Sequence, residues 1–85
     1  MKRLGIKFIV LDVLKPHQPS LAEFAEYIGG LEEVTKVDVS LEELDERTES
    51  LKVTVEGNGI DFEGLKKHIA QIGAVIHSVD KVVAA

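Results

Sequence analysis

The chain lacks cysteine and tryptophan altogether, and its aromatic residues are only three phenylalanines and one tyrosine. Without cysteine it can form neither a disulfide nor a thiolate metal centre. So few aromatic side chains also argue against an RNA-binding sheet, which needs them for base stacking. No apolar run approaches the roughly 18–20 residues that span a bilayer. These absences exclude thiolate metal carriers, stacking RNA platforms and membrane-spanning helices.

Acidic residues outnumber basic ones, 15 to 10, which gives a formal net charge of −5. Such a chain repels polyanions, so we expect neither nucleic acid nor a membrane surface among its partners. Lys7 and Asp12 interrupt the apolar stretch at residues 4–14. We therefore interpret that stretch as a strand rather than a signal peptide, and expect a cytoplasmic protein.

Eighty-five residues are enough for one domain, residues 1–85, because two cores would each be too small to stand alone. The hydrophobic fraction of 45% is normal for a folded protein. Domains of this size usually add a disulfide, a metal or a partner subunit to their stability. Because the chain has no cysteine for a disulfide, we expect the additional stability to come from self-association or from unusually good packing.

The first half of the chain predicts a strand followed by a helix. Residues 4–14 carry apolar side chains on both faces, as a strand buried on two sides does. Two prolines within residues 15–19 enforce a stiff loop. Ser20 and Glu23 have the spacing of a capping box, and the glycines at 29–30 end the helix. The inward stripe of this helix is Leu21, Phe24, Ala25 and Ile28.

Three further segments follow the first helix. Residues 34–44 alternate between apolar and polar side chains, turn at 45–48, and return as a second alternating strand at 51–56. Asp61 is expected to cap a second helix, which a glycine ends, and residues 74–83 form the last strand. The side chains expected to face inward from the second helix are Phe62, Leu65, Ile69 and Ile72.

The resulting order is βαββαβ, and the two halves repeat each other. The cap residues Ser20 and Asp61 are followed by apolar residues at the same offsets of one, four and eight positions. Two such split units form the ferredoxin-like α+β sandwich. Right-handed crossovers then give one four-stranded antiparallel sheet of order 4-1-3-2, with both helices on one face.

The other face of that sheet is expected to be partly apolar. The first strand carries two apolar sets, Ile6, Phe8 and Val10 on one face and Ile9, Leu11 and Val13 on the other. Whichever set turns away from the helices leaves uncovered apolar surface, which usually marks an interface. We therefore expect a homo-oligomer. The alternative is a twisted first strand that the C-terminal segment partly shields.

One polar cluster is a candidate binding site. The last strand should lie antiparallel beside the first, which makes Asp12 and His77 near cross-strand partners, with His17 just beyond the strand end. Imidazole and carboxylate groups suit Zn²⁺ or another divalent cation, and the candidate ligands are Asp12, His17, His77 and Asp80. If Asp12 faces His77 directly, strict alternation turns Ser78 and Asp80 to the opposite face. The alternative is a histidine that bonds a carboxylate for stability alone.

Two other segments have simpler interpretations. The acidic hairpin contains Glu42, Glu43, Asp45, Glu46 and Glu49. It resembles a calcium loop only in part, because Glu43 stands where the loop needs glycine, so we interpret it as a solvated hairpin. Residues 57–59 predict a strand-to-helix turn. No serine has a plausible base at motif spacing, so no catalytic constellation is expected.

Several segments together resemble a small archaeal family known as domain of unknown function 211. They are Val10 to His17, Pro19-Ser20, Val55 to Gly57, Ile60 to Glu63, Val75 to Asp80 and Val82 to Ala84. The resemblance implies a ferredoxin-like fold, an archaeal source and ring-forming homo-oligomers, and it implies no activity. The most recognisable positions of these segments are Asp12, Pro16, His17, Asp61, His77 and Asp80.

These observations favour a non-enzymatic oligomeric module that binds a small ligand or a divalent cation, with a regulatory role. The main alternative is a purely structural self-assembling protein without a small ligand. An enzyme ranks third, because fold analogy alone supports no activity.

Overall fold

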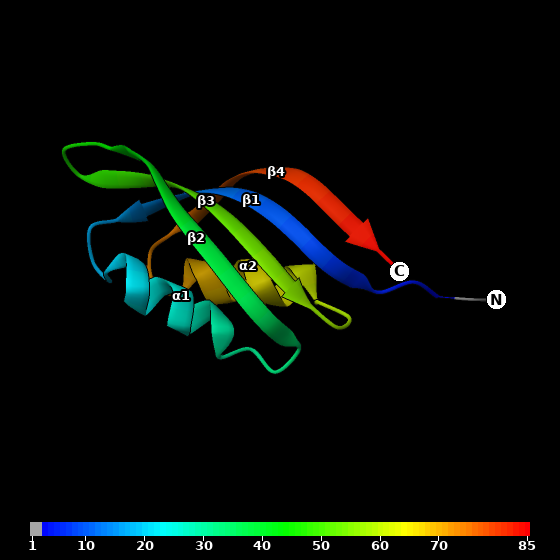
Figure 1. Cartoon of the computed structure of the whole chain (residues 1–85). Coiled ribbons are helices and arrows are strands. Elements are labelled where there is room, and N and C mark those ends of the chain that lie inside the picture. The colour runs from blue at the N-terminus through cyan, green and yellow to red at the C-terminus, as the bar shows by residue number, and fades with distance from the viewer. Residues whose placement is uncertain (1–2) are drawn as a thin grey trace.

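A computed structural model describes residues 3–85 and contains six elements (Figure 1). In chain order these are β1 (Ile6–Pro16), α1 (Leu21–Gly29), β2 (Val34–Leu44), β3 (Thr48–Gly57), α2 (Phe62–Ala70) and β4 (Val75–Ala84). The strands form one four-stranded antiparallel sheet with the order β2-β3-β1-β4. Both helices lie on one face of this sheet. The predicted ferredoxin-like fold and sheet order are confirmed.

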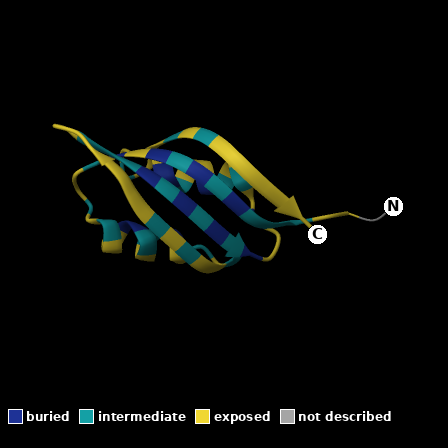
Figure 2. Ribbon diagram, turned by 45° about the horizontal axis from the view of Figure 1, so that its top comes forward, coloured by how far each residue is buried: buried dark blue, intermediate teal, exposed yellow. Residues whose placement is uncertain are grey.

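The hydrophobic core lies between the sheet and the helices. Alternate residues of the two central strands point into it, so that Leu11 and Val53, which are paired across β1 and β3, are both fully buried. The other buried apolar side chains of these strands and of the helices are Ile9, Val13, Leu51, Val55, Phe24, Ile28, Leu65 and Ile69. Each contributes about 1.5–3 kcal/mol through removal from water. The buried stripes run along β1 and β3, while most of the edge strand β4 is exposed (Figure 2).

The two helices begin differently. At α1 the Ser20 hydroxyl accepts the Glu23 backbone N–H at 3.2 Å, and the Glu23 carboxylate accepts the Ser20 backbone N–H at 2.9 Å. The predicted capping box is therefore confirmed. At α2 Asp61 does hold the N-cap position, but its side chain makes no capping hydrogen bond, so that part of the prediction is wrong. After α2 the chain turns at Gly73, whose φ of +83° favours glycine.

A tyrosine and a histidine join the helices. The rings of Tyr27 in α1 and His68 in α2 stack with centroids 3.8 Å apart and planes 2° from parallel. The Tyr27 hydroxyl donates to the His68 carbonyl, and His68 Nε2 lies 2.8 Å from the Tyr27 carbonyl. Each helix is nine residues long, and none among residues 3–85 is long and apolar enough to cross a membrane.

Candidate functional site

Four polar residues form a connected group on the outer face of the sheet, the face turned away from the helices. Lys52 of β3 places its Nζ 3.0 Å from Asp12 Oδ1 of β1 and 2.6 Å from Asp80 Oδ2 of β4. The Ser78 hydroxyl lies 2.9 Å from Asp12 Oδ2 and 3.0 Å from Asp80 Oδ1. We call these four residues the outer-face network.

Irregular pairing between β1 and β4 makes this arrangement possible. Asp12 pairs with Ser78, whereas the neighbouring pairs are Leu11 with Val79 and Val13 with Ile76. His77 is therefore an extra residue on β4. A second shift leaves Asp80 as another extra residue. Such bulges break strict alternation and turn side chains towards a common point, so Ser78 and Asp80 both reach the face of Asp12. Asp12 and His77 are thus near neighbours across the two strands, as expected, but they do not pair directly.

The charges of the outer-face network stabilise one another. Hydrogen bonds to Asp80 and then Asp12 raise the pKa of Lys52, and the Lys52 ammonium followed by the Ser78 hydroxyl lowers the pKa of Asp80. Lys52 therefore remains a cation throughout the physiological range. A lysine held in this state is neither a nucleophile nor a general base.

A hollow of about 310 Å³ lies beside this network, and it contains two of the predicted site residues. Its lining is Asp12, Val13, Leu14, Glu42, Ser50, Leu51 and His77. The structure thus brings Asp12 and His77 to one hollow without pairing them, and adds Glu42 from β2. Glu42 was considered only as part of the acidic hairpin, which was interpreted as solvated, so its position beside Asp12 and His77 was not predicted.

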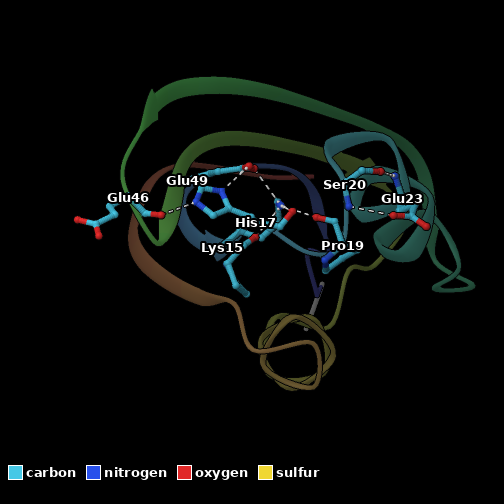
Figure 3. A network of polar contacts seen from close by, with 8 residues as sticks. Lys15, His17, Pro19, Ser20, Glu23, Glu46 and Glu49 are labelled. Atoms are coloured by element: carbon cyan, nitrogen blue, oxygen red, sulfur yellow. Dashed lines mark hydrogen bonds and ion pairs between the residues drawn. The ribbon is translucent and has the colours of Figure 1, made fainter.

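A second group of charges lies at the end of the sheet, where β1 meets the proline-containing loop (Figure 3). Lys15 is completely buried, and its Nζ lies 2.9 Å from Glu49 Oε1 of β3. The same ammonium donates to the backbone carbonyls of Pro16 and Pro19. These bonds satisfy a charge that would otherwise be very costly to bury. Lys15 ties the loop to β3, and it continues the inward alternation of β1.

His17 belongs to this second group and not to the outer-face network. Its Nδ1 lies 3.1 Å from Glu49 Oε2, and its Nε2 lies 2.9 Å from the Glu46 backbone carbonyl. Both partners only accept hydrogen bonds, so the doubly protonated imidazolium satisfies them best. The Glu46 carbonyl and then the Glu49 carboxylate raise the pKa of His17, while Lys15 and then His17 lower the pKa of Glu49.

The four predicted metal ligands therefore occupy different places. Asp12 and Asp80 share the ammonium of Lys52, His77 lines the hollow, and His17 lies at the end of the sheet. Within residues 3–85 no group of three or more histidine, aspartate or glutamate side chains is placed to hold a metal ion. The single chain thus offers a partly acidic hollow beside an ion-pair network in which two carboxylates share one ammonium.

Comparison with known proteins identifies the family. The model of the family DUF211, described as uncharacterised, matches residues 7–85. The chain is also similar to the Uncharacterized protein MJ0319 of the archaeon Methanocaldococcus jannaschii, with 44% identity over 80 residues. That alignment covers 94% of this chain and 82% of the relative. Neither comparison carries an activity, and together they establish that the chain belongs to the DUF211 family.

Proposed function

We propose that the protein is a non-enzymatic, self-assembling module whose edge strand β4 docks onto a second copy. The observation that carries this proposal is the apolar surface of β4. Its exposed apolar side chains, with their exposed fractions, are Val75 at 62%, Val79 at 44%, Val82 at 48% and Val83 at 39%. We call these four residues the β4 valines.

An exposed, apolar edge strand is a ready template for pairing with another chain. β4 is ten residues long, and its charges do little to protect it. Asp80 is bound to Lys52, and the Lys81 ammonium lies 5.5 Å from the centre of the Phe8 ring. Phe8 and Val10 on the outer face are half-buried, and four of the eight exposed large apolar side chains among residues 3–85 lie on β4. A small domain also gains stability from a partner that covers such surface.

The ion pairs of two lysines fit a non-enzymatic role. Lys52 is held protonated by two carboxylates, and Lys15 is buried against Glu49. Neither amine is free to take a proton from a substrate.

Native mass spectrometry tests the assembly directly. The wild-type protein should appear as an oligomer, and Val82→Lys should shift it towards monomer because the new charge lies in the contact. The control is Ala70→Lys, which adds the same charge at an exposed position of α2 and should leave the oligomer intact. A wild-type monomer at micromolar concentration would contradict the proposal.

A second candidate function is binding of a divalent cation or a small ligand in the hollow beside the outer-face network. Asp12, Glu42 and His77 line one hollow with two carboxylates and an imidazole, but within residues 3–85 they are not placed to hold one ion together, so cation binding would require these side chains to move. Zn²⁺ accepts both ligand types. The same role was predicted for His17 and Asp80, which lie outside the hollow lining.

Mass spectra recorded with and without a chelator test this second function. Cation binding predicts extra mass per chain that the chelator removes and that His77→Ala loses. His17→Ala should keep the extra mass, because His17 is at the end of the sheet. An oligomer of bare chains after incubation with Zn²⁺ would argue against a cation site and favour assembly alone.

A further inference from the structure

The sheet has two open edges, and they lie on opposite sides of the molecule. Among residues 3–85, β4 has only β1 as a neighbouring strand and β2 has only β3. Figure 1 shows α1 packed beside β2 at one edge, with β4 at the other. Each edge strand leaves backbone donors and acceptors without a partner strand. How copies assemble depends on which of these edges meet.

The β2 edge has a partly apolar hollow of its own. It has a volume of about 290 Å³, lies between α1 and the start of β2, and is lined by Ala25, Glu26, Gly29, Val34, Thr35, Lys36 and Val37. Farther along β2, Leu41 and Leu44 are exposed by 48% and 64%. The β2 edge therefore offers uncovered apolar surface as well as open backbone.

Two of the β4 valines lie on the helix side of the sheet, the same side as this hollow. Val79 pairs with Leu11 and Val82 pairs with Ile9, and both partners face the helix layer. Val79 and Val82 therefore also point to the helix side, but α2 leaves them half exposed. If β2 of a second copy continued the sheet beyond β4, these valines would lie on the same side as its α1.

Strand direction permits such a continuation. The order β2-β3-β1-β4 is antiparallel at every step, so β4 runs opposite to β2. A second copy in the same orientation can therefore add its β2 antiparallel to β4.

The charges of the two edges favour pairing of β2 with β4 over pairing of β2 with β2. Asp38, Glu42 and Glu43 of β2 take part in no ion pair among residues 3–85. Pairing of β2 with β2 would bring these acids together, and like charges in close pairs destabilise a sheet. β4 carries one acid, Asp80, which shares the Lys52 ammonium with Asp12, and one lysine, Lys81, so it does not bring the same repulsion to β2. β4 is thus the better partner for an acidic β2.

We infer that β4 of one copy pairs antiparallel with β2 of the next, with Val79 and Val82 seated against the hollow between α1 and β2. This inference rests on the proposed self-assembly and specifies its contact. Pairing of β4 with β4 would cover the β4 valines but leave the β2 hollow open, whereas the head-to-tail contact covers both edges. Such a contact uses two different surfaces and repeats from copy to copy.

Two complementary blocked variants test the inference. Val82→Lys blocks the β4 side. Gly29→Lys blocks the hollow, and the helix tolerates it because a Cβ at Gly29 would meet only Val37 Cγ2, at 3.9 Å. Circular dichroism verifies that both variants fold. Each variant alone should be monomeric in native mass spectrometry, and an equimolar mixture should form a heterodimer through the one intact β4 and the one intact β2.

Each other outcome has a definite meaning. If Gly29→Lys remains a dimer while Val82→Lys is monomeric, copies pair through β4 alone, and the inference fails while the proposed self-assembly stands. If both variants fold, are monomeric and form no heterodimer, the head-to-tail contact is also wrong. A monomeric wild type would remove the proposed self-assembly itself.

Discussion

At the scale of single residues, two lysines are bound by carboxylates from other strands of the chain. Lys15 is buried against Glu49 and two loop carbonyls, and Lys52 lies between Asp12 and Asp80. Each arrangement joins segments that are distant in the sequence. The exposed Lys52 contacts are screened by water, whereas loss of the Glu49 carboxylate would leave the Lys15 ammonium buried without its countercharge.

His17 gives a pH prediction at this scale. Its pKa in the folded protein is raised above the ordinary value of 6.5, so protonation favours the folded state. Its stabilising contribution should be complete below that value and lost as the pH rises through the raised pKa. The measurement is the urea midpoint of wild type and His17→Ala between about pH 5 and about pH 8, the range in which histidine titrates.

The difference in urea midpoint between wild type and His17→Ala should shrink as the pH rises. His77→Ala provides the control, because His77 lies outside the group formed by Lys15, His17 and Glu49. A difference that stays constant or grows with pH would show that the two hydrogen bonds do not depend on the imidazolium.

At the scale of the elements, the two helices differ in how their first turns are held. Ser20 and Glu23 satisfy two free N–H groups at the start of α1, while the Asp61 side chain satisfies none at α2. The helices are otherwise matched in length, and each buries two apolar residues in the core. Comparing the two helices therefore measures how much an N-cap hydrogen bond contributes to stability.

Ser20→Ala should lower the free energy of unfolding by about 1 kcal/mol, the usual value of a lost N-cap. Asp61→Ala should cost clearly less, because no capping hydrogen bond is lost. Chemical denaturation of both variants, at equal protein concentration, measures the difference. Equal losses would mean that Asp61 caps α2 in solution as its sequence position suggests.

At the scale of the whole molecule, stability is concentrated in one layer between the sheet and the helices. Phe24 is fully buried there, and Leu4 is 60% exposed outside it. Phe24→Ala should cost about 3–5 kcal/mol through lost burial and a residual cavity. Leu4→Ala should stay within about 0.5 kcal/mol, as surface substitutions usually do. Urea unfolding at fixed, low protein concentration compares the two variants. Similar losses in the free energy of unfolding would contradict the placement of Phe24 inside the core and Leu4 outside it.

Much of the fold was predictable because local patterns agree with the global arrangement. The alternation of Leu51, Val53 and Val55 predicts a strand with one buried face, and the spacing of Phe24 and Ile28 predicts the buried stripe of α1; both are confirmed. A missing hydrogen bond at Asp61 could not be predicted, because a cap residue type does not determine the rotamer of its side chain.

The sequence by itself determined the elements, their order and the buried side of the two helices and of β2 and β3, since these follow from periodicities of two and of 3.6 residues. It left open which face of β1 turns towards the helices. Only the tertiary structure decided which polar groups meet. The bulges at His77 and Asp80 depend on how β4 twists along β1, and they bring Ser78 and Asp80 to Asp12. A one-residue shift in pairing moves a side chain from one face of a sheet to the other, and no alternation pattern encodes where that shift occurs.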